Sequence, residues 1–497
     1  MNKKPLKLFI NENKYAIIFL YCLTFATYGI KLFFYSISID TEIMINNPIE
    51  LLNSWYAIGR FGLCFIKIAF GLIPINIVLT NCMTVIIIPI AIITWTYVFY
   101  EINKAKKSQL VNFIFGAIVI TSPLLAEQFN FTLQSFEIIF ALILEGIALI
   151  LINRWILSKK IINLIIAIPL LVISFSSYQL FLMLFIMGCV ISYILIFQDE
   201  SKKDNAKTYI TTIVKYMMIF IFTYLLYLVI SKVIQKVFNI SHIEYLDNMI
   251  TWGNEPILKT IARLGYFILS NLLGRGILYQ PFFLVIALAF VVYSIKLYMK
   301  KQISFIWYVI PSVFLVATPY LIAILTGKGI PARADFGVSI LLGFLILFLI
   351  QNLESKRKIL IGFSIAVIVV QFTITLTLFL NDYKRYNEDK KLAIEISDII
   401  IGNYDSNKPV VFLGSYNHNN KKIIKGETMG NSVFSWDHET LQGVNYRVHG
   451  FLNTLGISFV GPALKDIEEA KQYSEDLESY PNDNYIKEFE HFIIVKL

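Results

Sequence analysis

Two carboxylates, Asp40 and Glu42, come directly after the first long apolar segment of the chain. Ionised side chains are costly at the centre of a bilayer but tolerated at its surface, so acids at this place are either solvated helix ends or functional groups. The same stretch, residues 38–60, carries further polar and aromatic side chains: Asn53, Trp55, Tyr56 and Arg60. These types can bind a sugar, a phosphate and a membrane interface. We therefore take residues 38–60 as a candidate catalytic loop.

The composition is that of a polytopic membrane protein. Of the 497 residues, 57% are hydrophobic and only 15% are charged. Apolar stretches of the length that crosses a bilayer as a helix, about 20 residues, recur from Tyr15 to Leu380. The first of them, residues 15–37, is too long for the core of a signal peptide and lacks a small-residue cleavage site. We expect it to remain in the mature protein.

The net charge of +9 does not indicate nucleic-acid binding, because the Lys and Arg residues lie in short loops between spans and not on one face. The four cysteines lie in or beside apolar stretches without the spacing of metal ligands. We interpret them as small core residues and expect neither disulfides nor zinc.

Clusters of Lys and Arg occupy every second connection between the apolar stretches, which places those connections in the cytoplasm. The N-terminus is then cytoplasmic, and everything after Leu380 is extracytoplasmic. Residues 61–76 and 257–273 mix apolar and basic side chains and are typical of interfacial helices. The pattern predicts eleven spans, near residues 15–37, 77–100, 110–126, 134–153, 161–175, 179–197, 209–237, 277–297, 303–325, 336–352 and 359–380.

Two domains follow from this reading: an all-α transmembrane domain, residues 1–380, and a small α/β extracytoplasmic domain, residues 381–497. The second has a charged helical stretch first and a buried-strand pattern next. Its predicted elements are a helix over 382–400, a strand over 409–414, a helix over 463–477 and a strand over 492–496.

Phosphate-loop, zinc-protease, nucleophile-elbow and dinucleotide motifs are absent from the sequence. A nucleotide-driven pump and a zinc protease are therefore not expected. Few acids lie within the spans. Glu137 and Glu145 share one face of the fourth span, where they form either a buried polar pair or the wall of a water-filled site.

An enzyme that builds glycans on the outer face cannot use cytoplasmic nucleotide-sugars, so its donor must be an activated sugar that has crossed the membrane. A sugar linked to a lipid phosphate meets this need. Transfer from it requires a carboxylate base for the acceptor hydroxyl, cations for the departing phosphate and a groove for the lipid tail. A single displacement of this kind inverts the anomeric centre.

Asp40 or Glu42 could be the base. The cations on the same predicted side are Arg60, Arg263, Arg275, Lys328 and Arg333, although arginines at a membrane edge also extend to lipid headgroups. The candidates for acceptor binding are Trp55, Tyr56, Glu137, His242, Trp252 and Trp436, although Trp55 and Trp252 also fit ordinary interfacial aromatics. In the C-terminal domain, Trp436, Asp437 and Arg447 either contact the acceptor or form the core and ion pairs of a small domain.

The chain resembles the serotype-converting glucosyltransferases of bacterial surface polysaccharides, the Gtr type-II family. Ile-Asp-Thr-Glu at 39–42, followed by Trp-Tyr-Ala-Ile-Gly-Arg-Phe-Gly at 55–62, carries the resemblance in the N-terminal part. The stretches 426–437 and 445–456 are similar to the extracytoplasmic tail of that family. The resemblance covers most of the chain, and the order and spacing of its short motifs carry it.

The resemblance implies a GT-C-type fold, an acidic first outer loop that carries catalysis, and a polyprenyl-phosphate-glucose donor. A polyprenyl-phosphate glucosyltransferase and a flippase would supply that donor, and the acceptor would be an O-antigen, a teichoic acid or another wall polysaccharide. By position, Asp40 is the implied base, and Glu42 assists it or binds a sugar hydroxyl. Some enzymes of this fold use a divalent metal, but no third and fourth oxygen ligand is evident here, and we expect no cofactor.

Two other functions stay open from the sequence. A polysaccharide polymerase would also have many spans and outer arginines, but it would carry its charges in large loops between late spans. A flippase for lipid-linked oligosaccharides would have a charged central cavity and two pseudo-symmetric halves. The sequence shows neither arrangement, and transfer of a sugar other than glucose is also open.

Overall fold

The computed structural model describes residues 5–102, 109–198, 206–240, 250–275, 282–300, 303–417, 424–475 and 477–497. Its contacts divide the chain into two compact units. The helical unit comprises Met1–Leu32, Leu52–Phe129 and Gln134–Thr375. The sheet unit comprises Phe33–Leu51, Asn130–Leu133 and Leu376–Leu497. It therefore contains the C-terminal part of the chain together with the start of the candidate catalytic loop, residues 38–60, which we call the acidic loop.

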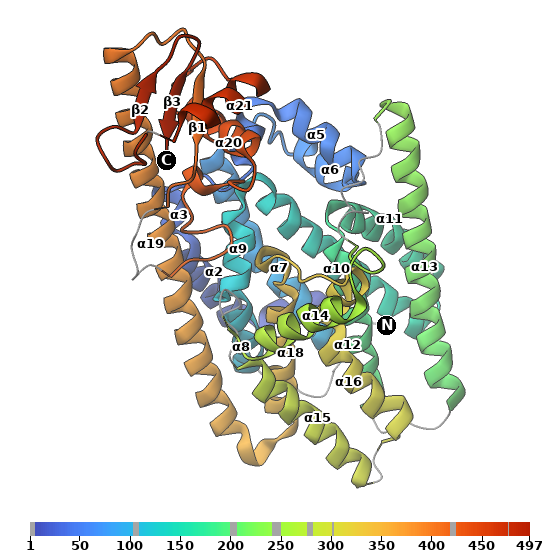
Figure 1. The fold of residues 1–497 in the computed structure, drawn as a ribbon. Helices are drawn as coiled ribbons and strands as arrows, with labels where there is room; N and C mark the ends of the chain where they lie inside the picture. Colours follow the sequence, from blue (N-terminus) through green and yellow to red (C-terminus); the bar gives the residue numbers. More distant parts are fainter. Residues whose placement is uncertain are drawn as a thin grey trace. The chain divides into compact units, whose positions relative to one another are not determined.

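The chain is largely helical because its long apolar stretches satisfy their backbone groups within each helix. The longer helices are α2 (Lys14–Tyr28), α7 (Ile77–Ile102), α8 (Gln109–Ile120), α10 (Thr132–Ser158), α11 (Ile161–Ser177), α12 (Leu180–Phe197), α13 (Ala206–Val237), α14 (Ile257–Leu272), α15 (Phe283–Met299), α18 (Gly337–Asn352) and α19 (Arg357–Asn403) (Figure 1). Shorter ones are α1 (Pro5–Glu12), α3 (Ile30–Phe33), α5 (Pro48–Ala57), α6 (Phe61–Ala69), α9 (Pro123–Asn130), α16 (Ile310–Ala317) and α17 (Leu321–Thr326).

Each of the eleven predicted apolar stretches overlaps a helix, so their helical character is confirmed. Six helical segments of the described chain are long and apolar enough to cross a membrane, or seven if α8 and α9, which bend by 51°, count as one span. Four shorter apolar helices, α2, α11, α15 and α18, cover further predicted spans. The number of crossings and their direction stay predictions. The stretches predicted as interfacial contain α6 and α14.

Small residues let α8 pack closely against its neighbours in the helical unit. A methyl group added at Gly343 of α18 would lie 2.9 Å from the Phe115 ring, and one at Gly116 would lie 2.6 Å from Leu20. Close approach of helix backbones through glycine is typical of helices packed in membranes. The hydroxyls of Ser122 and Ser339 are hydrogen-bonded in the same region.

The sheet unit contains three strands in the order β1-β3-β2. β1 (Val410–Leu413) runs parallel to β3 (Ile493–Lys496), with Val410 opposite Ile493, and β2 (Ile486–Glu488) runs antiparallel to β3. α20 (Leu441–Thr454) and α21 (Leu464–Tyr473) pack against β1 (Figure 1). The strands predicted over 409–414 and 492–496 and the helix over 463–477 are confirmed, whereas no prediction covered β2 or α20.

α19 continues without a break from its apolar half into its charged half. The sequence pattern predicts a span over 359–380 and a separate helix over 382–400. No Gly or Pro lies between Gly362 and Gly402, so nothing in the sequence interrupts the helix.

A buried ion cluster on α19 organises the sheet unit. The Arg385 guanidinium contacts Asp382 at 2.8 Å and Asp389 at 3.1 Å, and all three side chains are almost completely buried. These residues are three and four positions apart and therefore lie on one helix face. Arg385 also donates to the Ile37 carbonyl at 2.9 Å, which fixes the segment that enters the acidic loop.

The two acids of this cluster bind segments from distant parts of the chain. Asp382 accepts a hydrogen bond from the Ser36 hydroxyl and another from the Gly430 amide, the latter at 3.1 Å. Asp389 accepts from the Ser432 hydroxyl at 2.5 Å. The cluster thus joins the segment before the acidic loop to the segment before α20.

Replacing Arg385 by alanine should lower the free energy of unfolding of the sheet unit by about 3–5 kcal/mol, because two buried carboxylates lose their counter-charge. Hydrogen–deuterium exchange of peptides from β1, β3 and α20 in the purified full-length protein measures this. The matched control is Lys384→Ala on the same helix, since Lys384 is exposed and lies 3.8 Å from Glu388. That change should cost less than about 1 kcal/mol. Equal protection in both variants would contradict the assignment.

Candidate active site

The two acids of the acidic loop meet a single arginine of the C-terminal part of the chain. In the sheet unit, the Arg447 guanidinium lies 2.8 Å from Asp40 Oδ1, 2.5 Å from Glu42 Oε1 and 2.6 Å from Asp437 Oδ2. The Arg447 side chain is 10% exposed, and Glu42 is 1% exposed. Hydrogen bonds between ionised groups at these distances are the strong kind. Arg447 therefore fixes the orientation of both candidate catalytic carboxylates.

The backbone of the acidic loop turns sharply at Asp40. Asp40 has a φ of 69°, in the left-handed region, and directly precedes α4 (Thr41–Asn46). Asp enters this region more readily than most residues because its short polar side chain bonds locally. The turn leaves Asp40 31% exposed, so it remains accessible from solvent while Glu42, two residues later, is buried.

α4 and α20 approach each other closely at Gly450. The Asn46 side-chain amide donates to the Gly450 carbonyl at 2.8 Å. A methyl group added at Gly450 would lie 3.1 Å from the Glu42 Cγ atom. The absence of a side chain at this position therefore lets α20 pack directly on Glu42.

The environment of Glu42 alters its acidity. Burial raises the pKa of Glu42 from 4.5 to about 7, Arg447 opposes this rise, and the neighbouring Asp40 charge adds to it. Its Oε2 atom is buried and accepts no hydrogen bond from any described residue. A carboxyl group that titrates near neutral pH with one uncommitted oxygen fits a general base or a ligand for a hydroxyl group.

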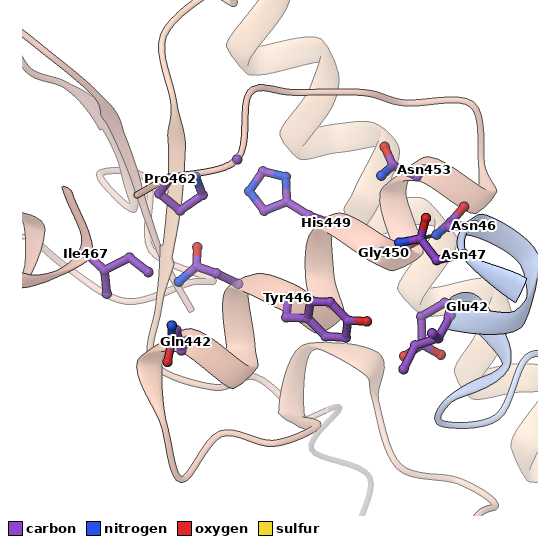
Figure 2. A pocket seen from close by; sticks show the side chains of 13 residues that line it. Glu42, Asn46, Asn47, Gln442, Tyr446, His449, Gly450, Asn453, Pro462 and Ile467 are labelled. Atoms are coloured by element: carbon purple, nitrogen blue, oxygen red, sulfur yellow. Dashed lines mark hydrogen bonds between the residues drawn. The ribbon is translucent and has the colours of Figure 1, made fainter. Parts of the chain in front are cut away.

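A pocket of about 330 Å³ opens beside this site, between α4 and α20. Its lining includes Glu42, Asn46 and Asn47 of the acidic loop and Tyr446, His449 and Asn453 of α20 (Figure 2). The His449 ring packs edge-on against Phe412 and bonds through Nε2 to the Val410 carbonyl at 2.9 Å. Burial lowers the pKa of His449, which favours a neutral ring at neutral pH.

Among the described residues, no three or more His, Cys, Asp or Glu side chains are grouped to hold a metal ion. At Arg447, a guanidinium occupies the centre of three carboxylates.

The helical unit holds a second buried ion pair, which includes a predicted acceptor-binding residue. Lys67 Nζ lies 2.7 Å from Glu137 Oε1, both side chains are fully buried, and the Trp55 ring lies 5.9 Å from the ammonium group. Glu145, predicted either to pair with Glu137 or to line a water-filled site, is buried and accepts from the Ser174 hydroxyl at 3.0 Å. Each of these acids thus has its own polar partner.

Two of the predicted phosphate-binding arginines already have partners within the helical unit. Arg60 donates to Gln179 Oε1 at 3.1 Å and lies over the Tyr178 ring at 4.7 Å. Arg263 makes two hydrogen bonds to the Glu255 carboxylate, at 3.0 and 3.1 Å. A donor phosphate would compete with the Glu255 carboxylate for Arg263.

The remaining predicted residues of the helical unit are dispersed over several elements. Tyr56 stacks on Phe238, with ring centres 5.4 Å apart, and the Trp252 indole donates to the Ile324 carbonyl at 2.8 Å. Lys328 and Arg275 are exposed, and Arg333 is half-buried. His242 lies outside the described residues.

Trp436 belongs to the sheet unit, where its ring is buried and lies 5.9 Å from the Arg385 guanidinium. The Arg447–Asp437 ion pair is one of the two alternatives that the sequence leaves open for the C-terminal domain. The extension of that pair to Asp40 and Glu42 has no sequence signal, because 405 positions separate Glu42 from Arg447. The polar residues of α20 that line the pocket likewise belong to no motif in the sequence.

Comparison with known protein families gives a match over most of the helical unit. A family model described as Glucosyl transferase GtrII matches residues 15–350 of the chain. No curated protein and no solved structure matches the chain significantly.

The raised pKa of Glu42 predicts a pH-dependent stability of the sheet unit. Because the folded-state pKa of about 7 exceeds the ordinary value of 4.5, this contribution is fully present below pH 4.5 and is lost as the pH rises through 7. The loss amounts to about 3 kcal/mol. Melting of wild type and Glu42→Gln between pH 4 and 8 measures it: the stability difference between them should shift in favour of the variant as the pH rises. A difference independent of pH would contradict the assigned environment.

Proposed function

Because the chain belongs to the GtrII glucosyl transferase family, we propose that it moves a glucosyl residue from a polyprenyl-phosphate-linked donor to a cell-surface polysaccharide. The family match spans most of the helical unit and includes the acidic loop. It favours sugar transfer over the polymerase and flippase alternatives. The several long apolar helices support the assignment of the chain as a membrane protein.

We place this reaction on the outer face of the cytoplasmic membrane, with the N-terminus in the cytoplasm and the C-terminal domain outside. The distribution of Lys and Arg among the loops supports this orientation. Nucleotide-sugars are confined to the cytoplasm, so the donor has to be a lipid-linked sugar that has crossed the bilayer. A polyprenyl-phosphate glucosyltransferase and a flippase would be the functional partners that supply it.

The observation that carries the proposed chemistry is the pair of ion pairs that Arg447 makes with Asp40 and Glu42 beside an open pocket. In the proposed reaction, a carboxylate of the protein takes the proton of an acceptor hydroxyl. The oxygen of that hydroxyl attacks the anomeric carbon of the donor at the same time. The bond from that carbon to the phosphate oxygen breaks, and the electron pair leaves with polyprenyl phosphate. Attack opposite the leaving group inverts the anomeric centre.

Asp40 is the proposed base because it is accessible to solvent and held by Arg447 at 2.8 Å. Glu42 assists it or binds a sugar hydroxyl. The pKa of about 7 also makes Glu42 suited to proton transfer at neutral pH, so both residues enter the test.

The departing phosphate needs cations, for which we propose Arg60, Arg333 and Lys328 before Arg263 and Arg275. Arg60 comes directly before Phe61 in the sequence, and Phe61 lines an apolar groove of about 480 Å³ in the helical unit. Its lining is contributed mostly by apolar side chains of α6, α11 and α13, among them Phe61, Phe65 and Val172. Such a groove suits an isoprenoid tail whose phosphate lies at Arg60.

The test is transfer by the purified full-length protein from synthetic polyprenyl-phosphate glucose to isolated cell-surface polysaccharides. Wild type should release polyprenyl phosphate and label the polysaccharide, and Asp40→Asn should lower kcat by at least about a thousandfold. Glu42→Gln should lower kcat less. If the kcat of wild type falls below pH 7, that fall should be absent in Glu42→Gln. A chelator should leave the rate unchanged, since the proposal uses no metal.

The matched control is Asp405→Asn, an exposed aspartate of the sheet unit remote in sequence from the site. Full activity in Asp40→Asn with none in Glu42→Gln would move the base to Glu42. Consumption of no donor by wild type, across glucose and other sugars and several acceptors, would reject glucosyl transfer as the function.

A further inference from the structure

The pocket between α4 and α20 carries polar groups that the fold itself does not use. Asn47, Gln442 and Asn453 line it and are exposed, and their side-chain amides make no hydrogen bond to another described residue. This contrasts with Asn445 nearby, whose amide is fully engaged with the backbone of Phe412 and Leu441. Three uncommitted amides in one pocket are typical of a site that binds a polar ligand.

We propose that this pocket binds a sugar residue of the acceptor polysaccharide and presents its hydroxyl to the carboxylates held by Arg447. The proposal rests on the proposed function, and it assigns the acceptor to a site formed by α4 and α20 of the sheet unit. Its main residues are Glu42, Asn47, Gln442, Tyr446 and Asn453 (Figure 2).

The chemistry of the lining matches a sugar ring. A carboxamide offers both donors and acceptors, as a pair of neighbouring hydroxyls requires. The Tyr446 ring, 47% exposed, offers an apolar face to the C–H groups of a pyranose. Glu42 supplies a carboxylate to the lining, and Arg447 holds this carboxylate at 2.5 Å.

The charge of the pocket lining favours the acceptor over the donor as its ligand. None of the described residues that line the pocket is Lys or Arg. The donor carries a phosphate, which would meet the Glu42 carboxylate here, and the Arg447 guanidinium beside Glu42 is already paired with three carboxylates. A neutral sugar residue lacks this penalty. The pocket volume of about 330 Å³ is at the lower end of the range of small-molecule sites, about 300–1,000 Å³.

Ligand binding tests the proposal without any transfer step. Saturation-transfer NMR is recorded on the purified full-length protein with the methyl glycosides of glucose, galactose, rhamnose and N-acetylglucosamine. Wild type should bind at least one of them. Tyr446→Ala and Asn453→Ala should weaken that binding at least tenfold, and Asn482→Ala, an exposed asparagine outside the pocket, should leave it unchanged.

Kinetics then identify which substrate uses the pocket. With polyprenyl-phosphate glucose and a polysaccharide that wild type glucosylates, Asn453→Ala should raise the KM for the polysaccharide at least tenfold. The KM for the donor and kcat should change less than twofold. Tyr446→Phe, which keeps the ring, should retain most of the affinity lost in Tyr446→Ala.

Three results would overturn the proposal: no binding of any glycoside by wild type, equal binding by wild type and both pocket variants, or a raised KM for the donor in place of the acceptor. These outcomes are distinct from failure of the proposed function. If the protein transfers glucose normally after both pocket substitutions, the proposed function stands and the proposed acceptor pocket is rejected. If the protein binds a glycoside through Tyr446 and Asn453 but consumes no donor, the pocket stands as a sugar site and the proposed function is rejected.

Discussion

Glu42 places a carboxylate in an almost water-free environment, and Arg447 supplies the charge that offsets its desolvation. Removing one partner of such a pair leaves a buried uncompensated charge, which is more destabilising than the pair is stabilising. The remaining contacts of Arg447, to Asp40 and Asp437, lie on the same guanidinium. Formation of the acidic site therefore depends on the correct placement of α20, although α20 is far from the acidic loop in sequence.

The other buried ion cluster of the sheet unit, at Arg385, helps to hold the segment before α20 in place. It fixes residues 36 and 37, just before the acidic loop, and residues 430 and 432, before α20, to one face of α19. The two segments that carry the site are thus anchored to the same helix. Gly450 then allows α20 to approach Glu42 closely, and the pocket lies along this contact.

The sequence predicts those features that follow from local patterns. Apolar stretches locate the helices, and the buried-strand patterns at 409–414 and 492–496 locate β1 and β3. β2 has only three residues, one of them buried, so its pattern is not distinctive. α20 carries an apolar stripe at helical spacing, Val444, Val448, Phe451 and Leu452, and this local signal could have been read. Asp40 and Glu42 are recognised from their place after an apolar stretch. Their partner is not, because the pairing of Glu42 with Arg447 spans 405 positions and depends on the tertiary fold. The spacing of Asp382, Arg385 and Asp389 is a local signal that could have been read.

The most direct test of this account is a double-mutant cycle between Glu42 and Arg447 in the full-length protein, with Glu42→Gln, Arg447→Met and the combined variant. The free energy of unfolding of the sheet unit and the rate of glucosyl transfer are measured for all four proteins. We predict strong coupling: Arg447→Met alone loses the most stability, and adding Glu42→Gln restores part of it, because the buried charge is gone. Effects on stability that simply add would show that the two residues do not interact, and would contradict the account.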